Sequence, residues 1–171
     1  MITGAILLES QERPAVSKER LESILFIGIP GSGKSSFYKE RFYATHVRIN
    51  RDMLKAPHRE RRLIETCLET GQRFVIDNTN LTRAARADYI RLAKEAKFRL
   101  VGYYFRTAVA AAIARNEERQ DGKIPKVGIF AAQKRLEVPA GEEGFDELYC
   151  VMLDREKGFS VEPGTAENLV K

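Results

Sequence analysis

Nine consecutive residues, "GIPGSGKSS" at Gly28 to Ser36, have the composition and spacing of a loop that binds phosphate. Glycines allow backbone N–H groups to approach phosphate oxygens, Lys34 can reach the β and γ phosphates, and Ser35 offers a hydroxyl ligand for Mg²⁺. A Gly-rich turn that only joins a strand to a helix is the alternative. The pattern predicts binding of ATP, or of another NTP, together with Mg²⁺. The residues expected to hold the nucleotide are Gly28, Pro30, Gly31, Ser32, Gly33, Lys34, Ser35 and Ser36.

Two acidic residues could complete such a site. Asp77 ends the apolar run "FVID" and could help to hold Mg²⁺ beside Ser35, although a cap for the following turn is the alternative. Asp52, in "NRD" after a short strand, could accept the proton of an attacking hydroxyl or orient that hydroxyl. Phosphoryl transfer depends mainly on positioning and charge neutralisation, so one aimed carboxylate is enough. A turn or cap residue is the alternative for Asp52 as well.

Two arginines four residues apart in "RNEERQDGKIP", Arg115 and Arg119, share one face at the end of an expected helix. Leading into a loop, they could close over the phosphates as a lid and neutralise charge that develops during transfer. An exposed helix end with ordinary Glu/Arg pairs is the alternative. Asn78 and Asn80 in "DNTN" are turn formers that could also face substrate.

These residues need a scaffold, and strands alternate with helices from residue 24 to about 153. This order indicates an α/β protein with a parallel sheet of about five strands and helices on both faces. Ligands of such sheets bind at the carboxyl ends of the strands, where the glycine-rich loop should lie. Thr82 and Thr107 are expected to cap helices, and Gly71 to end one. We expect an N-terminal extension at 1–20, one domain at 21–158, and a polar, frayed tail at 159–171.

The composition, with 43% hydrophobic and 31% charged residues, is that of an ordinary globular protein. No apolar run approaches the length of a membrane span, and the first residues do not resemble a signal peptide, so a cytoplasmic protein with no membrane partner is expected.

Cys67 and Cys150 are expected in the core, and His46 and His58 at the surface. The net charge of +5 permits an anionic partner without proving one.

Four stretches together, "GIPGSGKSS", "INRD", "VIDNTN" and "RNEERQDGKIP", resemble the kinase module of 5′-hydroxyl polynucleotide kinases in their order and spacing. These are the end-healing enzymes of nucleic acid repair, and the resemblance runs from about residue 23 to 153. It implies a P-loop NTPase or kinase fold with an arginine-bearing lid. It also implies Mg²⁺-dependent transfer of the γ-phosphate of ATP, or of another NTP, to a 5′-hydroxyl end of DNA or RNA.

The resemblance also implies roles for single residues. Asp52 is similar to the general base of the family, Lys34 and Ser35 to the clamp on the nucleotide, and Arg115 and Arg119 to the lid arginines. Family members bind the acceptor end in a basic groove near "NRD", and the residues expected there are Arg51, Lys55 and Arg86. With Asn78 and Asn80, which are expected to face substrate, they make up the predicted acceptor site. Family members are often fused to a phosphatase and some to a ligase. Nothing in this sequence resembles such a domain, so a separate protein is expected to supply any such activity.

Two alternatives stay open. The wider superfamily uses the same loop, acid and lid to phosphorylate small molecules, as toxin and antibiotic kinases do, and such an enzyme would not need an extended basic channel. A nucleotide-switched binding protein is the other alternative. The sequence lacks the Asn-Lys-x-Asp, Asp-x-x-Gly and "LSGGQ" motifs of such proteins, and a switch would have no need of Asp52.

Overall fold

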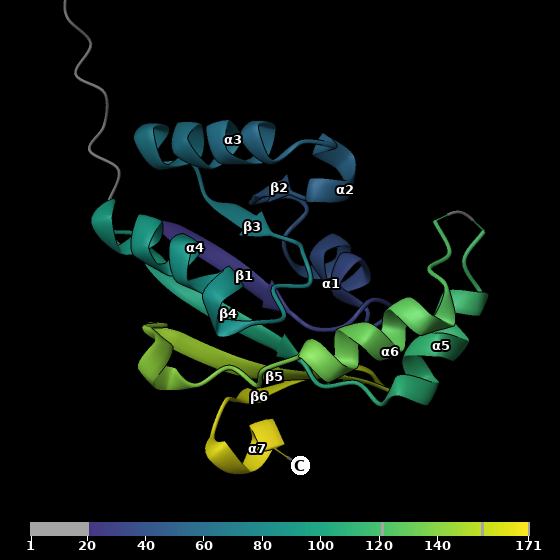
Figure 1. The fold of residues 1–171 in the computed structure, drawn as a ribbon. Coiled ribbons are helices and arrows are strands. Elements are labelled where there is room, and N and C mark those ends of the chain that lie inside the picture. Colours follow the sequence, from purple (N-terminus) through teal and green to yellow (C-terminus); the bar gives the residue numbers. More distant parts are fainter. Residues whose placement is uncertain (1–20, 121, 155, 171) are drawn as a thin grey trace, which may run out of the picture.

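The computed structural model describes residues 21–120, 122–154 and 156–170, so the expected N-terminal extension at 1–20 lies outside the described residues. The strands of the described chain are β1 (Glu22–Ile27), β2 (Val47–Ile49), β3 (Phe74–Ile76), β4 (Arg99–Phe105), β5 (Glu147–Asp154) and β6 (Gly158–Pro163). They form one sheet in the order β2-β3-β1-β4-β5-β6 (Figure 1). Strands β1 to β5 are parallel, which confirms the predicted sheet, and β6 adds an antiparallel edge.

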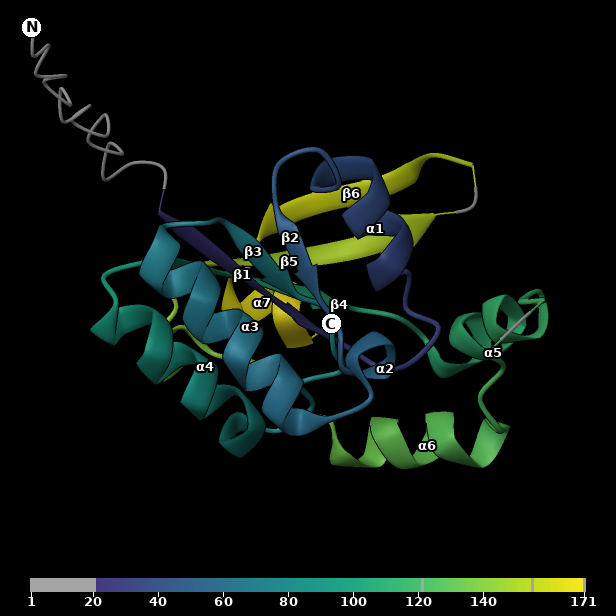
Figure 2. The same ribbon diagram turned by 90° about the horizontal axis from the view of Figure 1, so that it is seen from above.

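The helices cover both faces of this sheet, as the sequence predicts. They are α1 (Lys34–Arg41), α2 (Arg51–Leu54), α3 (Pro57–Thr70), α4 (Arg83–Glu95), α5 (Val109–Glu117), α6 (Lys126–Arg135), α7 (Ala166–Val170) and the short 3₁₀ helix η2 (Gly141–Glu143). Figure 2 shows α1 on one side of the sheet, α3 and α4 on the other, and α5 and α6 beyond the strand ends. Among the described residues, no helix has the length and apolar character needed to cross a bilayer.

Strand β1 explains why the central strands read as continuous apolar runs. Ile24 and Phe26 pack in the cluster beneath α1, which includes Phe37. Leu25 and Ile27 point the other way, into the cluster beneath α3 and α4. A parallel sheet covered on both faces leaves no solvent-facing side, so the side chains from Ile24 to Ile27 are all apolar.

Most predicted helix ends are confirmed. The hydroxyl of Thr82 accepts a 3.1 Å hydrogen bond from the N–H of Ala85 at the start of α4. Gly71 ends α3 in the left-handed conformation, with φ of 70°. The prediction for Thr107 was wrong, because the extended backbone continues through Ala108 and α5 begins only after it.

The expectation of a frayed tail was wrong for its described residues, 159–170. Residues Gly158–Pro163 form β6 and pair with β5, and Leu169 of α7 is buried against the sheet. The ring of Phe159 lies 5.1 Å from that of Phe37 on the opposite face. This pairing satisfies the backbone groups along the outer edge of β5. The segment has too few apolar residues for its strand period to be visible in the sequence.

The cysteines and one histidine lie where they were expected. Cys67 and Cys150 are buried, and burial raises the pKa of both thiols, so neither is a ready nucleophile. His58 is exposed. The prediction for His46 was wrong: its ring is buried, and its Nε2 lies 3.3 Å from a carboxylate oxygen of Glu22. That acidic partner is distant in the sequence, so the polar neighbours of His46 along the chain gave no sign of it.

Candidate active site

The loop between β1 and α1 has a shape that depends on its glycines. Gly31 and Gly33 adopt φ values of 79° and 98°, which side chains with a Cβ rarely allow. A Cβ on Gly31 would also lie 2.5 Å from the carbonyl oxygen of Ala112 in α5. The loop is therefore packed closely against α5, and its path is fixed before any ligand binds.

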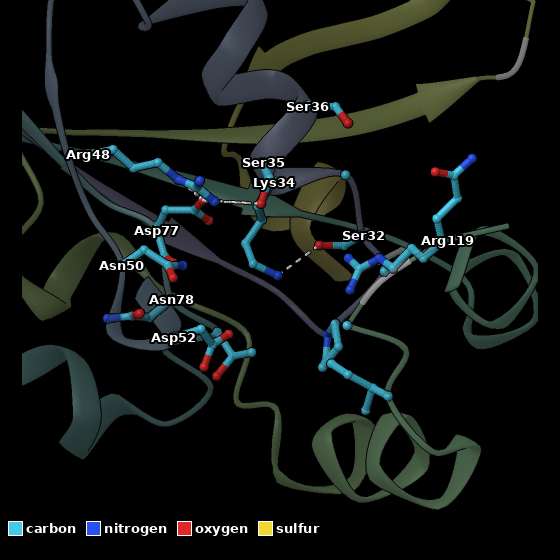
Figure 3. Close-up of a pocket in the computed structure, with 17 residues that line it drawn as sticks. Ser32, Lys34, Ser35, Ser36, Arg48, Asn50, Asp52, Asp77, Asn78 and Arg119 are labelled. Atoms are coloured by element: carbon cyan, nitrogen blue, oxygen red, sulfur yellow. Dashed lines mark hydrogen bonds and ion pairs between the residues drawn. The ribbon is translucent and has the colours of Figure 1, made fainter. Parts of the chain in front are cut away.

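A cavity of about 510 Å³ opens beside this loop at the carboxyl ends of the strands (Figure 3). Seven of the eight residues predicted to hold a nucleotide line it, those from Pro30 to Ser36. Gly28 lies behind them instead, where a Cβ would come within 3.0 Å of the Cβ of Phe105. The remaining lining residues are Arg48, Asn50, Asp52, Asp77, Asn78, Thr79, Arg119, Gln120, Gly122 and Ile124.

Lys34 is held inside the loop that precedes it. Its ammonium group donates to the carbonyl oxygens of Gly28 at 2.8 Å and Ile29 at 2.7 Å, and to the hydroxyl of Ser32 at 3.1 Å. Burial lowers the pKa of Lys34 from 10.5 to about 8, even though the nearby carboxylate of Asp77 acts to raise it. This ammonium would gain a stronger partner from a phosphate in the cavity.

Ser35 and Asp77 place two hard oxygen donors together at the cavity wall. The hydroxyl of Ser35 donates to Oδ2 of Asp77 at 3.3 Å, and the Asp77 side chain is only 2% exposed. Among the described residues no cluster of three or more metal-ligating side chains occurs. Mg²⁺ commonly binds through one or two protein oxygens, with the phosphates of a nucleotide and water as its other ligands. The donor set therefore fits a Mg²⁺ ion that arrives with a nucleotide.

Arg48, which the sequence analysis did not select, contacts both of these oxygens. Its Nε and Nη2 lie 2.8 and 2.6 Å from Oδ2 of Asp77, and Nη2 donates to Ser35 at 2.9 Å (Figure 3). The stretch "HVRIN" could have indicated this role. Side chains alternate along a strand, so Arg48 must point to the side opposite Val47 and Ile49.

Asp52 enters the same cavity from α2, a helix of one turn. Asn50 caps this helix by accepting a 3.0 Å hydrogen bond from the N–H of Met53, and its side-chain amide donates to the carbonyl of Asp77. The side chain of Asn50 thus connects the backbone at the end of β3 to the backbone of α2. In Figure 3 Asp52 and Arg119 lie on opposite sides of Lys34.

Behind α2 lies a buried acid that the sequence analysis also missed. The carboxylate of Glu60 accepts from Nε and Nη2 of Arg51 at 2.8 and 2.7 Å, and from the hydroxyl of Tyr89 at 3.0 Å. It also accepts from the amide of Asn78. Burial and the Glu60 charge raise the pKa of Tyr89 to about 12, so the phenol stays a donor. No sequence motif marks Glu60, since its partners come from three separate segments.

The two predicted lid arginines have different surroundings. Arg119 is exposed and lines the cavity, together with Gly122 and Ile124 of the following segment. Nε of Arg115 instead donates to the carbonyl of Gly31 at 2.8 Å, so that this residue supports the glycine-rich loop from α5. Of the two predicted lid arginines, Arg119 lines the cavity and Arg115 does not.

The structure contradicts part of the predicted acceptor site. Arg86 is fully buried, pairs with Glu143 at 2.7 Å, and cannot contact an acceptor. Asn80 is buried too, and its amide donates to the carbonyl of Phe26 at 2.7 Å. Arg86 was predicted as a cation of the basic groove near "NRD", and Asn80 as a turn former that faces substrate. Their tertiary partners, which lie 54 and 57 residues away, determine their actual roles.

The other three predicted acceptor residues lie near Asp52. Asn78 lines the cavity, whereas the guanidinium of Arg51 is held by Glu60 behind α2. Lys55 is exposed at the end of α2, where it has a positive φ of 63°. Neither Arg51 nor Lys55 lines the cavity itself. They lie at the two ends of the short helix that carries Asp52.

Comparison with known proteins supports the same fold. A family described as an AAA domain matches residues 24–139. A gluconokinase from Sinorhizobium meliloti superposes with a TM-score of 0.59 at 19% identity, covering 80% of this chain and 85% of that one. Kti12 from Chaetomium thermophilum, in complex with ADP-AlF3, gives a TM-score of 0.58 at 17% identity, covering 79% and 91% of the two chains. At these identities the likeness shows a shared P-loop fold and nothing about substrate.

Two relatives are more similar in sequence. A protein of Acanthamoeba polyphaga mimivirus, provisionally named a bifunctional polynucleotide phosphatase/kinase, is 33% identical over 158 residues, which are 88% of this chain and 38% of that protein. The bifunctional polynucleotide phosphatase/kinase of Schizosaccharomyces pombe is 26% identical over 135 residues, which are 76% of this chain and 33% of that protein. The chain thus spans about a third of the length of these relatives.

Proposed function

The chain belongs to the AAA domain family of P-loop proteins, and on that premise we propose that it is a polynucleotide 5′-hydroxyl kinase. It transfers the γ-phosphate of ATP, or of another NTP, to a 5′-hydroxyl end of DNA or RNA. The observation that carries this proposal is that Asp52 lines the same cavity as Lys34, Ser35 and Asp77. A protein that only bound a nucleotide would gain nothing from a carboxylate facing the phosphates, because like charges repel.

Each of the residues Asp52, Lys34 and Arg119 has a separate role in the phosphoryl transfer. The 5′-hydroxyl oxygen forms a bond to the γ-phosphorus while the bond from that phosphorus to the β–γ bridging oxygen breaks, and ADP leaves. Asp52 accepts the proton of the hydroxyl. Lys34 exchanges its carbonyl partners in the loop for phosphate oxygens, and Arg119 neutralises charge from the lid side.

Ser35 and Asp77 would hold the Mg²⁺ ion that accompanies the nucleotide. Held by these two oxygens, the ion would supply positive charge that offsets the negative charge of the phosphates. Two oxygen donors 3.3 Å apart, one of them a carboxylate, suit a small, hard cation. Asn50 then keeps Asp52 at a constant position relative to that end of the cavity, since its side chain bonds to the Asp77 carbonyl.

A polynucleotide is the acceptor that the surroundings of Asp52 favour. Lys55, directly after α2, and Arg59, near the start of α3, are exposed, and the chain carries a net charge of +5. A strand end brings several phosphates that such cations can neutralise, so acceptor binding should weaken as salt is raised. The names of both sequence relatives point to the same acceptor class.

The test is transfer of label from γ-labelled ATP to oligonucleotides with a free 5′-hydroxyl, with DNA and RNA side by side. Oligonucleotides that already carry a 5′-phosphate serve as blank acceptors, and Asp52→Asn serves as the enzyme control. We expect label on the 5′-hydroxyl oligonucleotides only, and its loss in the variant.

A panel of sugars, nucleosides and other small alcohols distinguishes the alternatives. Label on a small alcohol with none on either nucleic acid would identify a small-molecule kinase of the same fold. Tight nucleotide binding with no transfer to any acceptor would favour a nucleotide-switched binding protein, and the proposal would then fail.

A further inference from the structure

The guanidinium of Arg48 lies on the two oxygen atoms that the proposed function assigns to Mg²⁺. We propose that Arg48 is a latch for the metal end of the cavity: it holds Asp77 and Ser35 until Mg²⁺ arriving with a nucleotide displaces it. The Mg²⁺ concentration at which nucleotide binds is then set by competition between the ion and this side chain. The inference rests on the proposed Mg²⁺–nucleotide site but not on the nature of the acceptor.

The distances place the guanidinium of Arg48 and a Mg²⁺ ion in competition for the same oxygen atoms. Oδ2 of Asp77 accepts from Arg48 twice, at 2.6 and 2.8 Å, and the hydroxyl of Ser35 accepts at 2.9 Å. A Mg²⁺ ion binds oxygen at about 2.1 Å and needs near-ideal directions around itself. The two bonds from Arg48 and the one from Ser35 occupy Oδ2 of Asp77, so a Mg²⁺ ion can bind this oxygen only after the guanidinium has left.

The burial of the Asp77 carboxylate explains why it needs a cation beside it both with and without nucleotide. The Asp77 side chain is 2% exposed, and an ionised carboxylate is costly to bury without a partner. Arg48 supplies that partner in the absence of nucleotide. Exchange for Mg²⁺ replaces one positive charge by two at the same position, which is favourable once the phosphates of the nucleotide are also present.

The position of Arg48 in the fold allows it to leave. It stands on β2, an edge strand of the sheet, and its side chain is 23% exposed, in contrast to the enclosed Asp77. Its guanidinium carbon lies 5.5 Å from the ring centre of Tyr38, and its Nη1 reaches Met53 Sδ at 3.5 Å. Tyr38 and Met53 make weak contacts with Arg48, so the Asp77 and Ser35 bonds are what hold the guanidinium over the metal position.

The test measures equilibrium binding of ADP or a non-hydrolysable ATP analogue by titration calorimetry at increasing Mg²⁺, with no catalytic turnover involved. Arg48→Gln keeps a side chain of similar polarity but removes the charge, and Arg62→Gln, on the exposed face of α3, is the matched control. We expect the half-saturating Mg²⁺ concentration to fall about tenfold in Arg48→Gln, the size expected when a hydrogen bond to a charged group is lost. The affinity for metal-free nucleotide should change much less.

Arg48→Lys provides a second measurement in case the neutral variant folds poorly. A lysine ammonium can compete for Asp77 but cannot reproduce the fork of contacts, so the Mg²⁺ midpoint should lie between those of wild type and Arg48→Gln. An unchanged or higher midpoint in a folded variant would overturn the latch.

Measurements on the wild-type protein show whether the latch or the proposed kinase activity is wrong. If it binds nucleotide with no dependence on Mg²⁺, the metal site and the latch fail together. If it binds Mg²⁺–nucleotide but phosphorylates no oligonucleotide, the proposed acceptor is wrong while the latch stands.

Discussion

The side-chain oxygen of Asn78 accepts a 2.9 Å hydrogen bond from the backbone N–H of Arg51. This bond ties the turn after β3 to the first residue of α2. Asp77 directly precedes Asn78, and Asp52 directly follows Arg51. Asp77, proposed to bind the metal, and Asp52, proposed to accept the proton, are therefore each next to a residue of this hydrogen bond. The bond helps to fix the distance between the two carboxylates.

Replacing Asp52 by asparagine should abolish transfer while leaving nucleotide binding intact. The amide keeps the shape of the side chain but cannot accept the proton, and a positioned general base contributes on the order of 10²–10⁴-fold in rate. Label transfer and calorimetric nucleotide binding, measured on the same preparation, check this. Asp88→Asn, at an exposed acid of α4, is the control. Equal losses of transfer and binding would make Asp52 a structural residue.

Replacing Glu60 by glutamine should lower kcat more than nucleotide affinity, because Glu60 positions α2 and Asn78 but does not itself line the cavity. The variant loses charge-assisted hydrogen bonds to Arg51, which should reduce the free energy of unfolding by about 1–3 kcal/mol. Steady-state kinetics and urea unfolding measure the two effects. A variant that is destabilised yet has a normal kcat would limit Glu60 to holding the fold.

Much of this site could be predicted from the sequence, because its chemistry is concentrated in short stretches. The loop from Gly28 to Ser36, the acid at Asp77 and the carboxylate at Asp52 are each marked by residue type and local spacing, and the fold then follows from alternating elements. The structure brings all three stretches to one cavity. Local patterns were sufficient here because a parallel sheet gathers the carboxyl ends of its strands at one edge.

The errors came from residues whose partners are distant in the sequence. Arg86 looked like an exposed cation, but Glu143, 57 residues later, buries it. Glu60 and Arg48 were missed because each acts through contacts between separate elements, and the tail was misjudged because β6 is stabilised by pairing with β5. A single sequence carries no signal of such pairings when local periodicity is weak.

Nucleotide affinity should fall as pH rises above about 8. The pKa of Lys34 is lowered to about 8 by burial, and phosphates nearby must raise it, so nucleotide binding is accompanied by proton uptake. Below pH 8 Lys34 is already protonated before the nucleotide binds, so the nucleotide affinity is at its maximum. Above pH 8 Lys34 must take up a proton on binding, and this lowers the affinity. Calorimetry between pH 7 and 9.5 in two buffers of different ionisation enthalpy measures this uptake, and Lys34→Arg should abolish it. A flat affinity across this range would contradict the assignment.

The same pKa predicts how Lys34 affects folding. Its folded-state pKa of about 8 lies below the ordinary 10.5, so the cost of burying the ammonium is fully present below pH 8. This cost shrinks as pH rises from 8 to 10.5. Lys34→Met should therefore gain stability relative to wild type at pH 7, and lose that advantage by pH 10. Urea unfolding at both pH values checks the sign.

Substitutions of the two predicted lid arginines, Arg119 and Arg115, should affect kcat and nucleotide affinity differently. Arg119→Ala removes a charge that faces the cavity, so kcat should fall more than nucleotide affinity. Arg115→Ala removes the 2.8 Å bond to the carbonyl of Gly31, so nucleotide affinity should fall because the loop loses its support. Measuring kcat and nucleotide Kd for both variants tests this contrast. The same profile in both would mean that they act as one unit.

Arg86 should matter for folding and not for the acceptor. Its side chain and that of Glu143 are 0% and 1% exposed, and its guanidinium also donates to the carbonyls of Asn80, Leu81 and Glu137. Removing one partner of such a buried pair costs about 3–5 kcal/mol, so Arg86→Ala should greatly lower the free energy of unfolding. Arg91→Ala removes an exposed arginine of the same helix and should change it little. At a temperature where Arg86→Ala is folded, its KM for oligonucleotide should equal that of wild type, and a raised KM would return Arg86 to the acceptor site.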